Sequence, residues 1–375
     1  MVISPVAPAP GGAVPTAPRW LGGPSAFGLA LPAATPSAST LYAPRSVCIT
    51  DEAVIVADTG NHRLLIWQSG VPDADHSEAD VVVGQPDMTS DSPGMLFLPT
   101  GVLVTGGRLV VADAWHHRIL VWDRIPTRSG VAPSMVLGQE DPDGTDEGCG
   151  PQRFYWPFGL AMIGGMFWVA DTGNRRVLGW ADGLPEPGQP ADVVLGQPDA
   201  WSRGENRDGP VAADSLRWPH AVAGVGGLFV VADAGNHRIL GWSAPPAGDR
   251  PADVVFGQPS FETAVEFPYR PQGPAALRFP YAVAGAGERS LIVADTSNNR
   301  ILVLDDAPAT FSAQAVGAAA DRVLGQPDAD ANGENRWDRV SADSLCWPYG
   351  LSWRNGLLAV ADSGNNRVTI WALPA

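Results

Sequence analysis

Basic residues are scarce in this chain, which has 24 Lys and Arg against 40 Asp and Glu and a formal net charge of −16. A protein that binds nucleic acid without reading its sequence needs a basic stripe that displaces counterions from the phosphates. An anionic membrane surface likewise attracts basic segments. We therefore expect neither nucleic acid nor a membrane as partner, and we attribute the negative charge to solubility.

Cysteine is also rare, and the three residues Cys48, Cys149 and Cys346 lie far apart in the chain. They form neither a CxxC pair nor a zinc-type spacing with histidine, and an odd number without a framework fits a reducing compartment. No segment approaches the roughly 18 consecutive apolar residues of a membrane helix. The N-terminus lacks the basic start and unbroken apolar core of a signal peptide, so the cytoplasm is the expected location.

Glycine and proline, by contrast, are abundant: 43 Gly and 36 Pro are spread along the chain at regular places, which indicates many turns. The N-terminal stretch is the one place where Pro, Ala and Gly crowd together. This composition predicts a flexible tail over residues 1–19. Residues 20–375 carry one repeated pattern, which predicts a single domain.

The repeated pattern is the motif A-D-x-x-[NH]-x-R, which occurs six times. The copies span residues 57–63, 112–118, 170–176, 232–238, 294–300 and 361–367. The Asp residues of successive copies are 55 to 67 positions apart. Internal periodicity on this scale is typical of a solenoid or a propeller.

Each motif lies between short apolar runs that have the composition of β-strands. A β-branched run precedes it, an apolar run such as RILVW follows it, and a strand led by proline lies further upstream. A fourth strand, of the type VVLGQPD, occurs five times, at 81–87, 135–141, 193–199, 254–260 and 322–328. The missing sixth strand is predicted in RWLGGPS (19–25), so the N-terminal segment would complete the last unit and close a ring.

The A-D-x-x-N-x-R turn with a proline-led strand upstream resembles the NHL repeat. The resemblance covers nearly the whole chain after residue 19. It implies an all-β fold, a six-bladed β-propeller of four-stranded antiparallel blades, with the N-terminal strand completing the last blade. The second copy departs from the pattern, because Trp115-His116 stand where the other copies have Gly-Asn or Ser-Asn.

The Asp and Arg of the motif are interpreted as structural, because a catalytic constellation rarely exists in six copies whereas a turn does. Gly or Asn tolerates positive φ, and an Asp carboxylate binds backbone N–H groups two or three residues further on. The Arg then pairs with an Asp through its planar fork. The residues assigned to this turn are Asp58, Asp113, Asp171, Asp233, Asp295, Asp362, Arg63, Arg118, Arg176, Arg238, Arg300 and Arg367.

The position just before each motif Arg varies in residue type, and this variation predicts exposure to solvent. Several of these residues, with the two unusual residues of the second copy, are candidate contacts on the rim of one face. They are His62, Trp115, His116, His117, Arg175 and His237. On the same face we expect two loops that share the sequence GENR. We interpret these loops as a structural cap, in which Asn206 and Asn335 hold the loop in place.

The residue after each inner-strand proline should lie at the mouth of the central channel. These residues are Arg45, Thr100, Phe158, His220, Tyr281 and Tyr349. An Arg, a His and three aromatic side chains suit a planar, anionic or peptide-like group. Aromatic rings that merely plug the channel are the alternative.

Related propellers include metal-dependent lactonases and lyases, which hold an axial ion with residues of the inner strands. His220 is the one good ligand on the inner strands here, whereas a catalytic zinc normally needs three. The acidic run 141–147 lacks the carboxylate spacing of a calcium loop. We therefore expect no catalytic residue, cofactor or metal.

These observations favour a non-catalytic binding module or protein-interaction scaffold. We expect a monomeric ring whose partner is another protein or a small ligand. Two alternatives stay open. One is a lactonase- or lyase-like enzyme with metal ligands on its loops. The other is a small-molecule sensor that holds an anionic ligand near Arg45 and His220.

Overall fold

The computed structural model describes residues 18–23 and 31–374. Nearly all of the expected tail, residues 1–19, lies outside these ranges, as do the last two residues of the predicted strand region 19–25. Arg19 itself belongs to the first strand of the ring. Within the described residues, no helix is long and apolar enough to cross a membrane.

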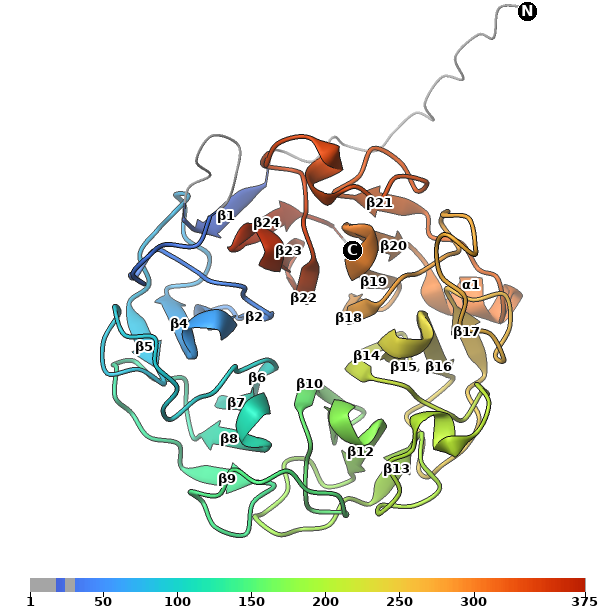
Figure 1. Cartoon of the computed structure of the whole chain (residues 1–375), viewed down its shortest axis with the longest axis horizontal. Helices are drawn as coiled ribbons and strands as arrows, with labels where there is room; N and C mark the ends of the chain where they lie inside the picture. The colour runs from blue at the N-terminus through green and yellow to red at the C-terminus, as the bar shows by residue number, and fades with distance from the viewer. Residues whose placement is uncertain (1–17, 24–30, 375) are drawn as a thin grey trace, which may run out of the picture.

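Six four-stranded antiparallel sheets surround a central axis, which confirms the predicted six-bladed β-propeller (Figure 1). The first three blades consist of β2 (Ser46–Ile49), β3 (Ala53–Asp58), β4 (Arg63–Gln68) and β5 (Val81–Val83); β6 (Val102–Thr105), β7 (Arg108–Asp113), β8 (Arg118–Trp122) and β9 (Met135–Leu137); and β10 (Pro157–Ile163), β11 (Met166–Asp171), β12 (Arg176–Trp180) and β13 (Val193–Leu195).

The other three blades continue the same order from the axis outward. They consist of β14 (Pro219–Val225), β15 (Leu228–Asp233), β16 (Arg238–Trp242) and β17 (Val254–Phe256); β18 (Pro280–Ala286), β19 (Ser290–Asp295), β20 (Arg300–Leu304) and β21 (Arg322–Leu324); and β22 (Pro348–Arg354), β23 (Leu357–Asp362), β24 (Arg367–Ala372) and β1 (Arg19–Gly22).

The ring closes as predicted, because the N-terminal strand β1 supplies the outer strand of the sixth blade. It pairs antiparallel with β24, with Arg19 opposite Ile370 and Gly22 opposite Arg367. Leu21 of β1 is buried against this blade. The first and last parts of the chain thus share one sheet, and the sixth blade is left with the same four strands as the others.

The second strands are buried on both faces, because each blade packs between two neighbours. All six residues of β3 are buried, and its five apolar side chains enter two different apolar clusters. Continuous apolar runs are expected for strands covered on both sides. A tryptophan such as Trp67 or Trp122 lies at or near the end of five of the six third strands, and each of these two donates its indole N–H to a backbone carbonyl at 2.9 Å.

Short helical turns connect the strands on one face of the disc. Each motif forms a 3₁₀ turn, and each of the two GENR loops contains another. The turns are η1 (Thr59–Asn61), η2 (Ala114–His116), η3 (Thr172–Asn174), η4 (Glu205–Asp208), η5 (Ala234–Asn236), η6 (Thr296–Asn298), η7 (Glu334–Trp337) and η8 (Ser363–Asn365).

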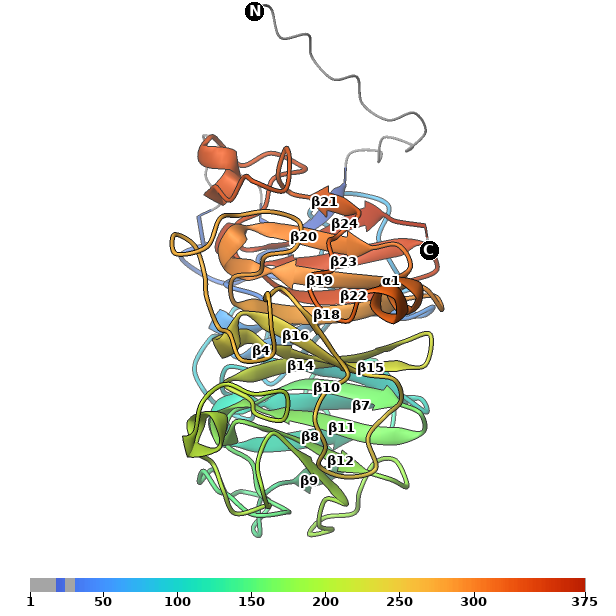
Figure 2. The same cartoon turned by 90° about the vertical axis from the view of Figure 1, so that its right-hand side faces the viewer.

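One α-helix, α1 (Ala307–Ala313), was not expected from the sequence. It begins after β20 because the Asp306 side chain accepts a hydrogen bond from the Ala309 N–H and Pro308 occupies the first turn. Figure 2 shows α1 at the opposite face of the disc from the GENR loops. The segment after α1 reaches the neighbouring blade, where Val316 forms a parallel bridge with Val255 at the outer edge of β17.

Candidate functional site

The motif Asp binds three groups from two different parts of its blade. In the first blade, one carboxylate oxygen of Asp58 accepts hydrogen bonds from Arg63 Nε at 2.7 Å and from Asn61 Nδ2 at 2.8 Å. The other oxygen accepts from the backbone N–H of Tyr42, at 2.6 Å. The expected bonds from Asp58 to backbone N–H groups two or three residues further on are not made. The carboxylate instead binds side chains of its own turn and the backbone of the segment that leads into the inner strand.

The same buried ion pair recurs in all six blades, with Nε–Oδ2 distances of 2.7 to 2.9 Å. In the second blade His116 replaces the motif Asn, and its Nδ1 lies 2.9 Å from Asp113 Oδ2. The remaining N–H groups of each Arg donate to backbone carbonyls; Arg63, for example, donates to Ser37 O at 2.9 Å. The charged groups of the motif are therefore satisfied by contacts inside the fold.

The residue before each motif Arg, rather than the Gly or Asn of the motif, adopts the left-handed conformation, with φ between 53° and 56°. The predicted exposure is wrong at His237, Asn299 and Asn366, which are buried. His62, His117 and Arg175 are half-buried. The position varies in type because it needs a residue that tolerates positive φ, which Asn and His do better than most.

Five of these six side chains accept a hydrogen bond from the backbone of the next blade. His237 Nδ1 accepts from the backbone N–H of Phe279 at 3.2 Å, and Asn299 Oδ1 accepts from that of Trp347 at 2.9 Å. His62, His117 and Asn366 make the corresponding bonds. A ring nitrogen that accepts an N–H carries no proton, so these histidines are neutral. Burial accordingly lowers the pKa of His62 and His117, and lowers that of His237 to about 4.

The remaining rim candidates lie in separate places. Arg175 donates to Gly173 O of its own turn at 2.8 Å. Trp115 stacks on Trp156 with ring centroids 5.3 Å apart, and the Arg45 guanidinium carbon is 5.9 Å from the Trp115 ring. Trp115 is therefore the rim residue that extends the wall of the channel mouth. A partner contact by the half-buried rim residues His62, His116, His117 and Arg175 stays a prediction.

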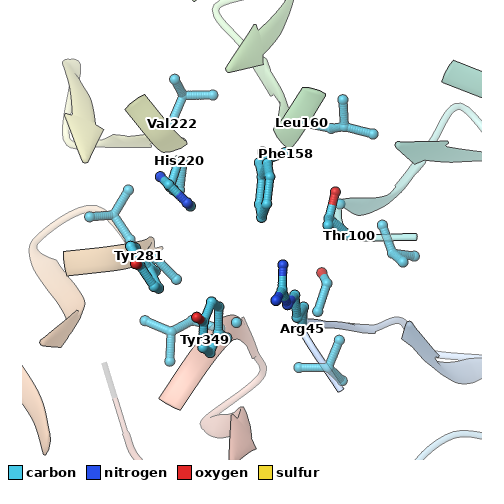
Figure 3. A pocket seen from close by; sticks show the side chains of 18 residues that line it. Arg45, Thr100, Phe158, Leu160, His220, Val222, Tyr281 and Tyr349 are labelled. Atoms are coloured by element: carbon cyan, nitrogen blue, oxygen red, sulfur yellow. The ribbon is translucent and has the colours of Figure 1, made fainter. Parts of the chain in front are cut away.

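The six residues that follow the inner-strand prolines line one pocket on the axis, with a cavity of about 100 Å³ (Figure 3). Below them lies an apolar ring two residues further along each inner strand. It consists of Val47, Val102, Leu160, Val222, Val283 and Leu351. This floor was not predicted, although the repeated Val or Leu two positions after each post-proline residue is visible in the sequence.

The wall of the mouth is a chain of stacked side chains. Ring centroids are 4.6 Å apart for Phe158 and His220, 4.2 Å for His220 and Tyr281, and 4.6 Å for Tyr281 and Tyr349. The guanidinium carbon of Arg45 lies 5.0 Å from the Tyr349 ring. Offset rings and a cation over a ring face are both favourable arrangements, so the wall is held in place before any ligand arrives.

Thr100 differs from the other five mouth residues, because it is buried and donates its hydroxyl to Pro157 O of the next blade at 3.0 Å. The residue between mouth and floor is small in every blade. A Cβ atom at Gly350 would lie 2.6 Å from Arg45 O of the adjacent strand. Small residues are needed there because the inner strands converge on the axis.

His220 is neutral and its tautomer is fixed. Its Nδ1 lies 2.9 Å from the carbonyl oxygen of Trp218, and a carbonyl can only accept, so Nδ1 carries the proton and Nε2 carries a lone pair. Burial, together with a smaller effect of the positive charge of Arg45, lowers the pKa of His220 to about 4. Burial also raises the pKa of Tyr281, so its phenol stays protonated at neutral pH.

Two further sequence interpretations concern loops and metals. Asn206 does tie down its GENR loop: Asn236 Nδ2 donates to Asn206 Oδ1 at 2.8 Å, and Asn335 makes the same bond with Asn365. Within residues 18–23 and 31–374, no group of three or more His, Cys, Asp or Glu is arranged to hold a metal ion.

No protein-family model and no curated protein matches this chain. Solved structures with a similar arrangement include the WD40 propeller domain of Doa1 (TM-score 0.47, 11% identity, covering 90% of this chain and 97% of that one). A streptogramin B lyase has a TM-score of 0.46 and 11% identity over 91% of this chain and 95% of its own. Virginiamycin B lyase from Staphylococcus aureus has 0.46 and 10%, over 90% and 97%. Likenesses this remote carry no argument about function.

Proposed function

We propose that this six-bladed propeller is of the NHL type and serves as a non-catalytic binding module. The ligand group enters the mouth of the central channel, and the loops around it present the rest of the interface. The assignment to the NHL type rests on the six motif turns, each with its buried Asp–Arg pair. A cytoplasmic, monomeric ring with a protein or small ligand as partner, and no nucleic acid or membrane, belongs to the same proposal.

The observation that carries the proposal is the state of the Arg45 guanidinium. It lies in a mouth lined by Tyr349 and Phe158, above an apolar floor, and none of the described residues that line this pocket is Asp or Glu. Each motif Arg is paired with the buried Asp of its own blade. The Arg45 guanidinium, in contrast, faces an open cavity. Rings that served only as a plug would fill the axis rather than surround a cavity.

The loops on the same face favour a protein as the larger partner. Trp337 lies in a GENR loop and Trp201 in the loop that follows β13, and these side chains are 79% and 71% exposed. Exposed tryptophans are frequent hot spots of protein interfaces. A partner that inserts one group into the mouth would cover these loops as well.

The test compares the wild-type protein with a variant in which His220, Tyr281 and Tyr349 are replaced by Ala. Proteins and small molecules that co-purify with each are quantified by mass spectrometry. We expect the variant to lose the specific partners. Its circular dichroism spectrum and its size-exclusion elution volume should stay those of the folded protein. Recovery of the same partners by the variant would show that the mouth is not the site. Stoichiometric zinc or calcium in the purified protein would favour the enzymatic alternative.

A further inference from the structure

The mouth offers one cation in a fixed position. The Arg45 guanidinium rests against the Tyr349 ring at 5.0 Å and the Phe158 ring at 5.9 Å, and the close-up shows it directed toward the middle of the pocket (Figure 3). No described side chain accepts a hydrogen bond from this guanidinium. A planar guanidinium presents parallel N–H groups that match the two oxygens of a carboxylate.

The mouth also offers a ring-nitrogen acceptor whose direction is fixed. Because Nδ1 of His220 donates to Trp218 O, the lone pair is on Nε2, and none of the described residues donates to it. Stacking between Phe158 and Tyr281 prevents the His220 ring from turning freely, since the His220 and Tyr281 planes are only 16° apart. An acceptor held in this way is complementary to an N–H or O–H group.

The size and shape of the pocket limit what can reach both groups. The cavity of about 100 Å³ has an apolar floor, so only a compact group enters it. A cation and a neutral acceptor that line the same pocket are complementary to an anion with a hydrogen-bond donor next to it. We propose that the mouth binds a carboxylate with an adjacent N–H or O–H, the carboxylate on Arg45 and the donor on His220 Nε2.

Two sources supply this chemistry, and the inference rests on the mouth being the binding site proposed above. One source is a free small acid, such as an N-acyl amino acid. The other is the C-terminus of a polypeptide, where the last backbone N–H lies next to the free carboxylate. Both present the same atoms to Arg45 and His220, and they differ in what lies outside the mouth.

The test is calorimetric titration of the full chain with matched probes. N-acetylglycine has both groups, N-acetylglycinamide lacks the charge, and N-acetylsarcosine lacks the N–H. We expect N-acetylglycine to bind, and each analogue to bind at least about tenfold more weakly, as is usual when a charged or buried partner is lost. Inorganic phosphate tests whether any anion suffices.

Two substitutions assign the contacts. Arg45→Met should weaken N-acetylglycine at least about tenfold while leaving the already weak amide unchanged. His220→Phe keeps the stacked ring and should abolish the preference for N-acetylglycine over N-acetylsarcosine. A short peptide with a free C-terminus that binds at least about tenfold more tightly than N-acetylglycine, with loss on amidation, would identify the polypeptide source. Equal affinity for the two would identify the small acid.

Equal binding of acid and amide, equal binding of phosphate, or no binding of any probe would overturn the carboxylate assignment. These failures are distinct from failure of the proposed function. If no probe binds but the His220, Tyr281 and Tyr349 variant still loses its partners, only the ligand class is wrong. If that variant keeps its partners, both proposals fall.

Discussion

At the scale of single residues, the buried Asp–Arg pair joins the motif turn to the segment that leads into the inner strand of its blade. Asp171 and Arg176 are both fully buried, with a Nε–Oδ2 distance of 2.8 Å, and Asp171 also accepts from the Tyr155 N–H. Removing one partner leaves a charge without compensation inside the protein. The pair thus links the turn to the entry of the inner strand, and with it the position of the next residues toward the mouth.

Arg176→Met should reduce the free energy of unfolding by about 3–5 kcal/mol, because Asp171 then remains buried and unpaired. Chemical denaturation followed by tryptophan fluorescence measures this. The control is Arg108→Met, which removes an exposed pair with Asp123 at 3.9 Å and should cost about 1 kcal/mol or less. Similar losses for both variants would contradict the role assigned to the motif pair.

The pairing of Asp with Arg could be predicted at this scale, because the two residue types recur six times at one spacing, as the parts of a repeated turn do. The left-handed residue could not. Gly is the usual choice for positive φ, and the motif contains a Gly in four of the six copies, yet the chain places His, Arg or Asn in that conformation. His62, for example, binds the backbone N–H of Leu98, 36 residues away, and sequence spacing does not reveal such a contact.

At the scale of elements, the same left-handed residues hold neighbouring blades together. His237 illustrates the dependence on charge. It accepts from the Phe279 N–H, and the ionisable groups that face it are Glu266, Arg217 and Arg278. Burial outweighs the attraction of Glu266 and lowers the pKa of His237 to about 4. The folded state therefore favours neutral His237. Its contribution to stability is complete above the unfolded pKa of about 6.5 and is lost as the pH falls toward 4.

His237→Asn should preserve the hydrogen bond to the next blade, because Asn299 and Asn366 make the same bond from the same backbone conformation. We expect the variant to be about as stable as the wild type at pH 7.5. At pH 5 it should be more stable by on the order of 2 kcal/mol, since no buried imidazole must be protonated. Thermal denaturation from pH 8 to 5 measures the difference. An unchanged pH dependence would mean that His237 does not carry the effect.

Strand elements could be predicted well, and the helix α1 could not. The strands follow short apolar runs bounded by turn residues, and the repetition corrects errors in any single copy. The segment that contains α1 occurs in one blade alone, so no other copy supports its interpretation. Its capping residue Asp306 is visible in the sequence, but the anchoring contact between Val316 and Val255 depends on the arrangement of two blades.

At the scale of the whole molecule, the ring depends on β1. Leu21 is buried and β1 covers the outer edge of β24. An uncovered strand edge offers unpaired backbone groups to other chains. Five GQPD-type strands against six motifs, with the candidate segment RWLGGPS (19–25) upstream of the first motif, made this closure predictable.

Deletion of residues 1–22 should lower the melting temperature by roughly 5 °C or more and promote association, because β24 loses its partner and Leu21 its contacts. Deletion of residues 1–16 keeps β1 intact and serves as the control, with the melting temperature expected to match that of the wild type. Differential scanning calorimetry and light scattering compare the two. Equal melting temperatures for both deletions would contradict closure by β1.

The position of the mouth residues could be predicted from the repeat, since the residue after each inner-strand proline must approach the axis. Their chemistry could not be completed from the sequence. The lone pair of His220 Nε2 depends on the Trp218 carbonyl, and the orientation of Arg45 depends on rings from the second, third and sixth blades. Such details arise where six distant segments meet.

The most direct test of the central claim, that ligands enter at the channel mouth, is photo-crosslinking from a defined position. Benzoylphenylalanine replaces Phe158 in one variant and Leu228, at the start of β15 on the opposite face, in another. After irradiation in cell extract, mass spectrometry identifies the adducts. We predict specific adducts from position 158 that Arg45→Met abolishes, and none from position 228. Absence of adducts at 158, or the same adducts at both positions, would contradict the account.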